Sequence, residues 1–151
     1  MITITRTNAA NPDFISLVKL LDEDLAIRDG DEHAFYDQYN KLENINHVVL
    51  AYNNNEAVSC GAFKELEPGI IEIKRMFTAV QARGKGIASK VLKELEIWAT
   101  ELSYTAAILE TGKKQPEAIA LYKKNGYYII PNYGPYAGME NSVCFKKKLR
   151  V

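Results

Sequence analysis

The 151-residue sequence has little cysteine, little histidine and no excess charge of either sign. Its two cysteines, Cys60 and Cys144, and its two histidines, His33 and His47, are far apart, so we predict no metal site. Both cysteines lie in strand-like surroundings, and we interpret them as buried, reduced thiols of a cytoplasmic protein. Neither histidine is a candidate catalyst, although His33 could line a substrate entrance.

Charges of opposite sign balance, with 19 Lys and Arg residues against 19 Asp and Glu residues. Nucleic-acid-binding proteins usually carry a basic excess, so we expect no nucleic-acid partner. No apolar run approaches the roughly 20 residues of a membrane helix, and the N-terminus has no signal-peptide core. We therefore expect a cytoplasmic protein with no membrane partner. Length and composition predict one domain over residues 1–151.

Hydrophobic periodicity and turn residues predict alternating strands and helices. We expect strands at 2–6, 47–52, 57–66, 70–80, 106–111, 127–130 and 142–149. We expect helices at 12–28, 32–42, 87–102 and 116–125. From the pattern alone this order indicates an α/β or α+β domain with a mixed sheet.

The stretch 70–102 is the most informative, because a buried strand leads through a short glycine loop into an amphipathic helix. Gly84 and Gly86 lack the Cβ atoms that would keep a phosphate away from the backbone, and Arg83 and Lys85 add positive charge. Free N–H groups and the helix dipole favour an anion at such a turn. The alternative is that the glycines only shape the turn. The spacing excludes a P-loop and a dinucleotide-binding fingerprint.

Two motifs in this order resemble those of the GNAT N-acetyltransferase superfamily. Arg83-x-x-Gly86-x-Ala88 is similar to the loop that binds the acetyl-CoA pyrophosphate, and a second register beginning at Gln81 also fits. Residues 118–127, AIALYKKNGY, resemble the family's A-I-x-L-Y-x-K-x-G-F/Y segment. The resemblance covers essentially the whole chain. It implies an α/β (α+β) fold with a mixed, mostly antiparallel sheet of about seven strands, four flanking helices, and two central parallel strands that splay apart.

The resemblance implies acetyl-CoA as co-substrate, without a metal. The residues that would bind it are Phe77, Thr78, Val80, Arg83, Gly84, Lys85, Gly86, Ile87, Ala88, Gln115 and Lys124. Gln115 stands where the family often has Asn, and Pro116 after it departs from the pattern and could shift the helix start. Lys124 could reach the 3′-phosphate or be an ordinary solvated helix lysine.

Acetyl transfer needs a base for the amine and an acid for the leaving thiolate. Tyr122 matches the family's acid Tyr, and the alternative is that its ring only packs under the sheet. Glu72 is the candidate base, with Glu110 as its rival; a Glu on a central strand must be paired or functional. Lys74 or Arg75 could instead neutralise Glu72. Strict alternation places Glu72, Lys74, Met76 and Thr78 on one face of the strand and Ile71, Ile73, Arg75 and Phe77 on the other.

The acceptor is the least specified partner. Four tyrosines crowd the C-terminal third, and the loop at 131–141 could wall an acceptor site or contribute to a homodimer contact; the tyrosines are Tyr127, Tyr128, Tyr133 and Tyr136. We expect an N-acetyltransferase acting on the primary amine of a small metabolite, such as an amino acid or polyamine. The alternatives are a protein amine acceptor and a non-catalytic acyl-CoA-binding sensor or regulator.

Overall fold

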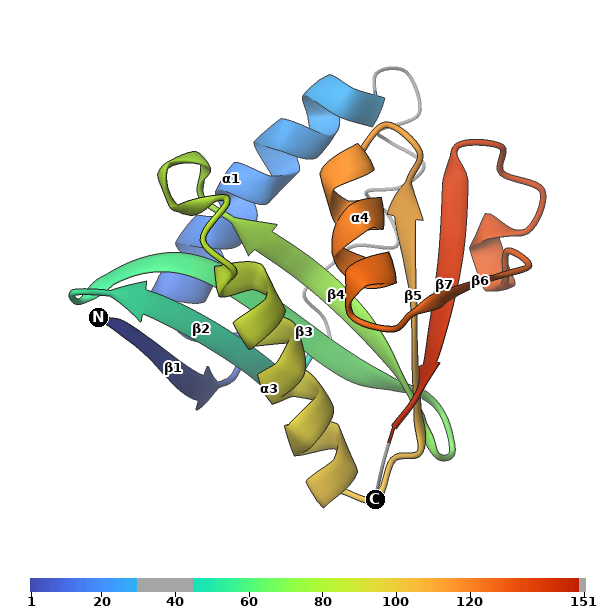
Figure 1. Ribbon diagram of the computed structural model, residues 1–151, viewed down its shortest axis with the longest axis horizontal. Coiled ribbons are helices and arrows are strands. Elements are labelled where there is room, and N and C mark those ends of the chain that lie inside the picture. The colour runs from blue at the N-terminus through green and yellow to red at the C-terminus, as the bar shows by residue number, and fades with distance from the viewer. Residues whose placement is uncertain (30–44, 150–151) are drawn as a thin grey trace.

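The computed structural model describes residues 1–29 and 45–149 (Figure 1). The strands of its sheet are β1 (Ile2–Thr7), β2 (His47–Asn53), β3 (Glu56–Glu67), β4 (Ile70–Thr78), β5 (Ala106–Gly112), β6 (Tyr128–Ile130) and β7 (Ser142–Lys148). The α-helices in these ranges are α1 (Pro12–Asp29), α3 (Ile87–Glu101) and α4 (Pro116–Lys124). Short 3₁₀ turns lie at Val80–Ala82 and Gly134–Tyr136. The helix predicted at 32–42 lies outside the described residues.

The seven strands form one sheet in the order β1-β2-β3-β4-β5-β7-β6. Every neighbouring pair is antiparallel except β4 and β5, which are parallel. The β4–β5 ladder contains only three residue pairs and ends where Glu72 lies opposite Ile108. Beyond that point the two strands diverge toward their C-terminal ends (Figure 1). The predicted mixed sheet with splayed parallel strands is therefore confirmed.

Local sequence signals explain several boundaries. The Asn11 side chain accepts a hydrogen bond from the Asp13 N–H at 2.8 Å and caps α1. Asn54 and Asn55 turn the β2–β3 hairpin with positive φ angles of 51° and 74°. Gly126 follows α4 with φ 89°, as expected of a residue that ends a helix in the left-handed region.

The sheet separates two hydrophobic clusters. On one face α3 and α4 cover the larger cluster, which includes Ile71, Ile73, Val91, Leu92, Leu95, Leu109 and Tyr122. On the other face α1 covers the smaller cluster, which includes Phe14, Leu17, Val18, Val48, Leu50 and Cys60. In Figure 1, α3 and α4 lie in front of the sheet.

A β-bulge in β4 corrects the predicted strand faces. Arg75 has φ 61°, and the pairing register with β3 shifts at this point. The extra residue reverses the alternation, so Met76 packs with Ile71 and Ile73 on the α3 face while Phe77 packs on the α1 face. Strict alternation was therefore wrong beyond Lys74. Arg75 lies on the same side as α1, because it forms an ion pair with Asp22 of that helix.

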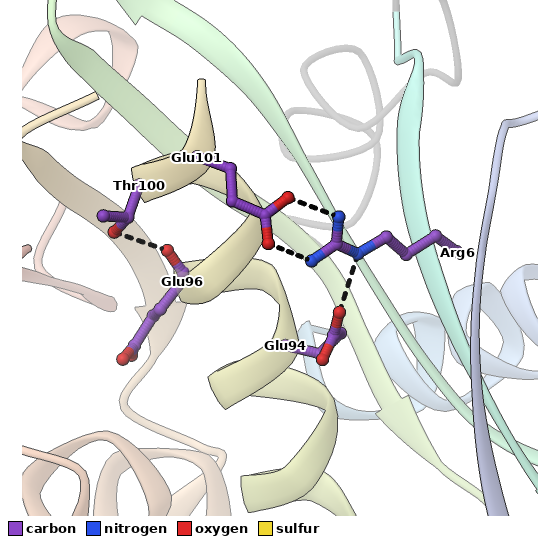
Figure 2. Close-up of polar contacts among 5 residues, drawn as sticks. All are labelled: Arg6, Glu94, Glu96, Thr100 and Glu101. Atoms are coloured by element: carbon purple, nitrogen blue, oxygen red, sulfur yellow. Dashed lines mark hydrogen bonds and ion pairs between the residues drawn. The ribbon is translucent and has the colours of Figure 1, made fainter. Parts of the chain in front are cut away.

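An ionic contact ties the edge strand β1 to α3 (Figure 2). The Arg6 guanidinium donates to Glu94 at 2.7 Å and to both carboxylate oxygens of Glu101 at 2.8 and 2.9 Å. Its charged carbon also lies 5.0 Å from the centroid of the Trp98 ring. These contacts brace the helix whose N-terminus follows the glycine loop.

Candidate active site

The loop before α3 presents a run of unused backbone donors. Gly84 and Gly86 have φ angles of 78° and 75°, and Gly86 is the N-terminal cap residue of α3 with no side chain capping the helix. Within the described chain, the N–H groups of residues 84–89 donate no hydrogen bond to protein, and the first to do so is that of Lys90, which donates to the Gly86 oxygen. A Cβ on either glycine would meet open space. These amides have the geometry of an anion site.

A cleft of about 390 Å³ runs from this loop to the region where β4 and β5 part. Most of the predicted site residues line it, namely Glu72, Phe77, Thr78, Arg83, Gly84, Gly86, Ile87, Ala88, Gln115, Tyr122 and Lys124. Glu110 lines it as well. Val80 and Lys85 are outside its wall, and the Val80 side chain points into solvent with 74% exposure. The structure thus brings most of the predicted residues together in one concavity.

Arg83 is exposed, and its side chain lies back against the end of β4. Its Nε donates to the Thr78 carbonyl at 2.9 Å, and its guanidinium lies 5.8 Å from the centroid of the Phe77 ring. The side chain therefore stiffens the junction between β4 and the loop. A guanidinium in this position also adds positive charge to the rim of the cleft.

Across the cleft, α4 begins at Pro116, with Gln115 as its cap residue. Pro116 occupies the first helical turn, where its missing N–H costs nothing. The Gln115 side chain caps no backbone group of the helix and lines the cleft instead. Gln115 therefore lines the cavity in spite of the proline that follows it, with its amide nitrogen beside Gly112.

Tyr122 is buried between the sheet and the cleft. Its ring lies 5.7 Å from that of Tyr127 and 5.8 Å from that of Phe145, centroid to centroid. Burial raises the pKa of Tyr122 above its ordinary value, and the nearby Glu110 charge raises it further. The phenol is therefore protonated at neutral pH and is a proton donor by default. The packing role considered for this ring is present, and a catalytic role is compatible with it.

Glu72 is held by three groups. The Tyr133 hydroxyl donates to its Oε2 at 2.7 Å, while the Lys74 and Lys64 ammonium groups lie 3.8 and 4.0 Å from its Oε1. The ion pair with Lys74 is the neutralising contact considered from the sequence. Arg75 does not share this task, because it pairs with Asp22 at 2.6 Å. Burial is the main cause of a lowered pKa for Lys74, and the Glu72 charge opposes it.

Glu110 projects into the same cleft from β5. The Ser142 hydroxyl donates to its Oε2 at 2.9 Å. The sequence carried no signal for this contact, because Ser142 lies 32 residues away in the last strand. The strand register explains the contact, because β5 and β7 pair antiparallel with Gly112 opposite Ser142. Glu110, two residues before Gly112, is therefore a diagonal neighbour of Ser142.

The four C-terminal tyrosines have different surroundings. Tyr133 binds Glu72, and Tyr136 lines the cleft, as expected for a loop that walls it. Tyr127 instead donates to Glu96 of α3 at 2.9 Å, and burial raises its pKa well above the ordinary value. Tyr128 is 48% exposed on the edge strand β6. Of the four, Tyr136 lines the cleft, and Tyr133 is connected to it through its hydrogen bond to Glu72.

Other predictions concern residues outside the cleft. Cys60 and Cys144 are buried free thiols, and His47 stacks on Phe63 at 4.6 Å. His33 lies outside the described residues. Among residues 1–29 and 45–149, no group of His, Cys, Asp and Glu side chains could hold a metal ion. No helix in these ranges is long and apolar enough to cross a membrane.

Comparison with known proteins agrees with this geometry. The family model described as "Acetyltransferase (GNAT) family" matches residues 14–127. An IAA acetyltransferase of Azospirillum brasilense is 30% identical over 150 residues, which cover 98% of each chain. A Klebsiella pneumoniae protein provisionally assigned as an acyl-CoA N-acyltransferase is 31% identical, with 99% of each chain covered and a TM-score of 0.82.

The fold is shared more widely. A GNAT family acetyltransferase from Elizabethkingia anophelis, solved with acetyl-CoA bound, has a TM-score of 0.71 at 23% identity, with 98% of each chain covered. This likeness concerns the fold, including the mixed sheet and the helices on its two faces. The motifs, the fold and the matches agree, and the chain belongs to the acetyltransferase (GNAT) family and is an acyltransferase.

Proposed function

We propose that the protein is an acetyl-CoA-dependent N-acetyltransferase that transfers the acetyl group directly to the primary amine of a small metabolite. One observation carries the proposal: residues 84 and 86–89, whose N–H groups donate to no acceptor in the described chain, line the same cleft as Tyr122, Glu72 and Glu110. Bare N–H groups at a helix N-terminus bind a diphosphate well. The acetyl-CoA-bound relative of the same fold supports acetyl-CoA as the donor.

The remaining predicted residues fit a donor bound between β4 and α4. Because the β4–β5 ladder ends at Glu72, the backbone of Phe77 and Thr78 is not paired with β5. Their carbonyl oxygens accept side-chain hydrogen bonds from Ser59 and Arg83, and each keeps a second lone pair for an amide of a pantetheine arm. Gln115 faces the arm from the other wall, and Lys124 is placed to meet a phosphate. Val80 and Lys85 would contact the donor only at the outer rim of the loop.

The chemistry needs three proton transfers. When bound, acetyl-CoA supplies the thioester whose C–S bond breaks as the C–N bond to the amine forms. Glu72 accepts a proton from the acceptor ammonium, directly or through water, and Tyr122 gives its proton to the departing thiolate. The second proton lost by the nitrogen replaces the one that Tyr122 gave. Glu110 remains the alternative base, because it lines the same cleft and is close enough to raise the Tyr122 pKa.

The charges around the acceptor part of the cleft support an amino-acid type of acceptor over a polyamine. Lys74 and Arg75 line the cleft beside Glu72 and Glu110, so both signs of charge are present. The Arg75 Nε is buried and has no hydrogen-bond partner within the described residues. A zwitterion would meet both signs of charge there, sharing Lys74 with Glu72 and Arg75 with Asp22. A polyamine would bring further positive charge toward two cations that are already largely desolvated.

Release of free CoA over a panel of amines tests the proposal. We expect turnover with an α-amino acid to exceed that with its amide and with polyamines, and Lys74→Met to reduce this preference. Faster transfer to lysine-containing peptides would instead indicate a protein acceptor. CoA binding without transfer to any amine would contradict catalysis and favour the sensor alternative.

A further inference from the structure

The connection between β6 and β7 is held together by hydrogen bonds among its own residues. The Asn132 amide donates to the Met139 carbonyl at 3.0 Å and to the Ser142 carbonyl at 3.1 Å. The Tyr136 N–H donates to the Tyr133 carbonyl, and the rings of these tyrosines meet edge to face with centroids 5.7 Å apart. These bonds hold the connection in one shape.

This connection also packs on the sheet. Tyr136 and Cys144 are buried against each other, and Ile130, Tyr133 and Met139 pack around them. Cys144 lies on β7 directly opposite Glu110 of β5. The cluster is separate from the one under α1. The connection therefore has its own apolar attachment, next to the polar floor of the cleft.

From this fixed position two hydroxyl groups reach the two cleft carboxylates. Tyr133 donates to Glu72 at 2.7 Å across 61 residues of sequence, and Ser142 donates to Glu110 at 2.9 Å. Glu72 and Glu110 come from β4 and β5, the strands that part just beyond Glu72. One C-terminal segment thus contacts one carboxylate on each of the two diverging strands.

We propose that Tyr133 is a positioning residue that holds Glu72 in the orientation needed to accept the proton of the acceptor amine. The inference rests on the proposed function. Its physical basis is that the Tyr133 hydroxyl donates to Oε2 at 2.7 Å, whereas the Lys74 and Lys64 ammonium groups lie 3.8 and 4.0 Å from Oε1. The short hydrogen bond from Tyr133 is therefore the contact that orients Oε2. Each carboxylate oxygen keeps another lone pair for the amine or a bridging water. Small errors in the placement of a catalytic group reduce rate far more than they reduce binding.

Tyr133→Phe removes the hydroxyl and keeps the ring that packs on Tyr136. Tyr52→Phe is the matched control, because the Tyr52 hydroxyl also donates to a carboxylate at 2.7 Å, that of Asp13, outside the cleft wall. We expect Tyr133→Phe to lower kcat by about tenfold, the value of one charge-assisted hydrogen bond, with the KM for acetyl-CoA unchanged. We expect Tyr52→Phe to retain the wild-type kcat.

A double-mutant cycle with Glu72→Gln shows whether Tyr133 acts through Glu72. We expect Glu72→Gln to lower kcat and the added Tyr133→Phe change to cause no further loss. The positioning role is overturned if Tyr133→Phe has the wild-type kcat, or if it lowers kcat equally in both backgrounds.

The same cycle separates this inference from the proposed function. If the wild-type protein acetylates an amine and Glu72→Gln does so at the same rate, the role of Glu72 is refuted, and the positioning role of Tyr133 with it. Acetyl transfer itself would still stand. Absence of transfer by the wild-type protein would refute the proposed function as a whole.

Discussion

The two ends of the cleft are built in opposite ways. At the end where we propose that the cofactor binds, called the cofactor end, residues 84–89 are consecutive in sequence, and their N–H groups donate to no acceptor in the described part of the chain. At the proposed acceptor end, Glu72, Glu110 and Tyr133 come from distant segments, and both carboxylates accept hydrogen bonds from protein hydroxyls. Exposed amides need no protein partner before a ligand binds because water can accept their hydrogen bonds, whereas a buried or half-buried carboxylate needs partners within the protein. An anion site can therefore be short and local, while an acceptor site needs the folded sheet.

The largest effect is expected at the cofactor end. Gly86→Glu puts a negative side chain at φ 75°, in open space where the phosphates would bind. We expect CoA affinity to fall by roughly 100-fold or more, equivalent to two charge-assisted hydrogen bonds. Gly86→Asn is the control, because Asn tolerates positive φ without adding charge. Calorimetric titration with CoA measures both variants, and undiminished affinity of Gly86→Glu would remove the loop from the cofactor site.

The second prediction concerns Tyr122, which lies between the two ends of the cleft, and its effect is on turnover rather than on CoA affinity. Tyr122→Phe should lower kcat by about 100-fold, the usual value of a general acid, with CoA affinity unchanged. Tyr127→Phe is a neighbouring control, because its ring lies 5.7 Å away and its hydroxyl binds Glu96 instead. Steady-state kinetics of both variants measure the change in kcat, and titration with CoA measures the affinity. Equal turnover of Tyr122→Phe and wild type would leave Tyr122 with a packing role alone.

A change outside both ends should alter stability only. Arg6→Met removes the ion pairs to Glu94 and Glu101 and keeps an aliphatic side chain beside Trp98. We expect a slightly lower unfolding midpoint, because these charges are partly exposed and screened. The difference from wild type should shrink as NaCl is raised, and CoA affinity should stay the same. A difference that is independent of salt would assign the effect to packing.

The smallest effect concerns pH. Burial lowers the pKa of His47 below its ordinary value of 6.5, so the folded state binds this proton less readily than the unfolded chain. The stability contributed by neutral His47 is present above 6.5 and is lost as pH falls toward the lowered folded pKa. His47→Phe keeps a ring on Phe63, and its stability should fall less than that of wild type between pH 7.5 and 5.5. Urea unfolding at both pH values tests this, and parallel losses would contradict it.

Much of the cofactor end could be predicted because its determinants are local. Two glycines in a strand–loop–helix junction specify positive φ and open space, and both are observed. The second motif predicted Tyr122 within a helix, and in the structure it lies in α4 and lines the cleft. Helix caps and hairpin turns were predictable for the same reason, because the residues that cause them are adjacent to the backbone they shape.

The acceptor end was predictable only in part. Glu72 and Glu110 were identified as buried strand carboxylates, but nothing local to them indicates Tyr133 or Ser142 as partners. The bulge at Arg75 is the clearest failure: alternation assumes one residue per pleat, and a single extra residue reverses every side chain that follows. That reversal places Arg75 beside Asp22 and Met76 in the α3 core.

By itself the sequence determined the order of strands and helices, the glycine loop, and the residue types available for acid–base chemistry, since these follow from neighbours along the chain. The tertiary structure alone decided which carboxylate meets which hydroxyl and on which side of the sheet the bulged strand presents its charges. Such pairings join residues 32 and 61 positions apart, and only the packed sheet brings them within hydrogen-bonding distance.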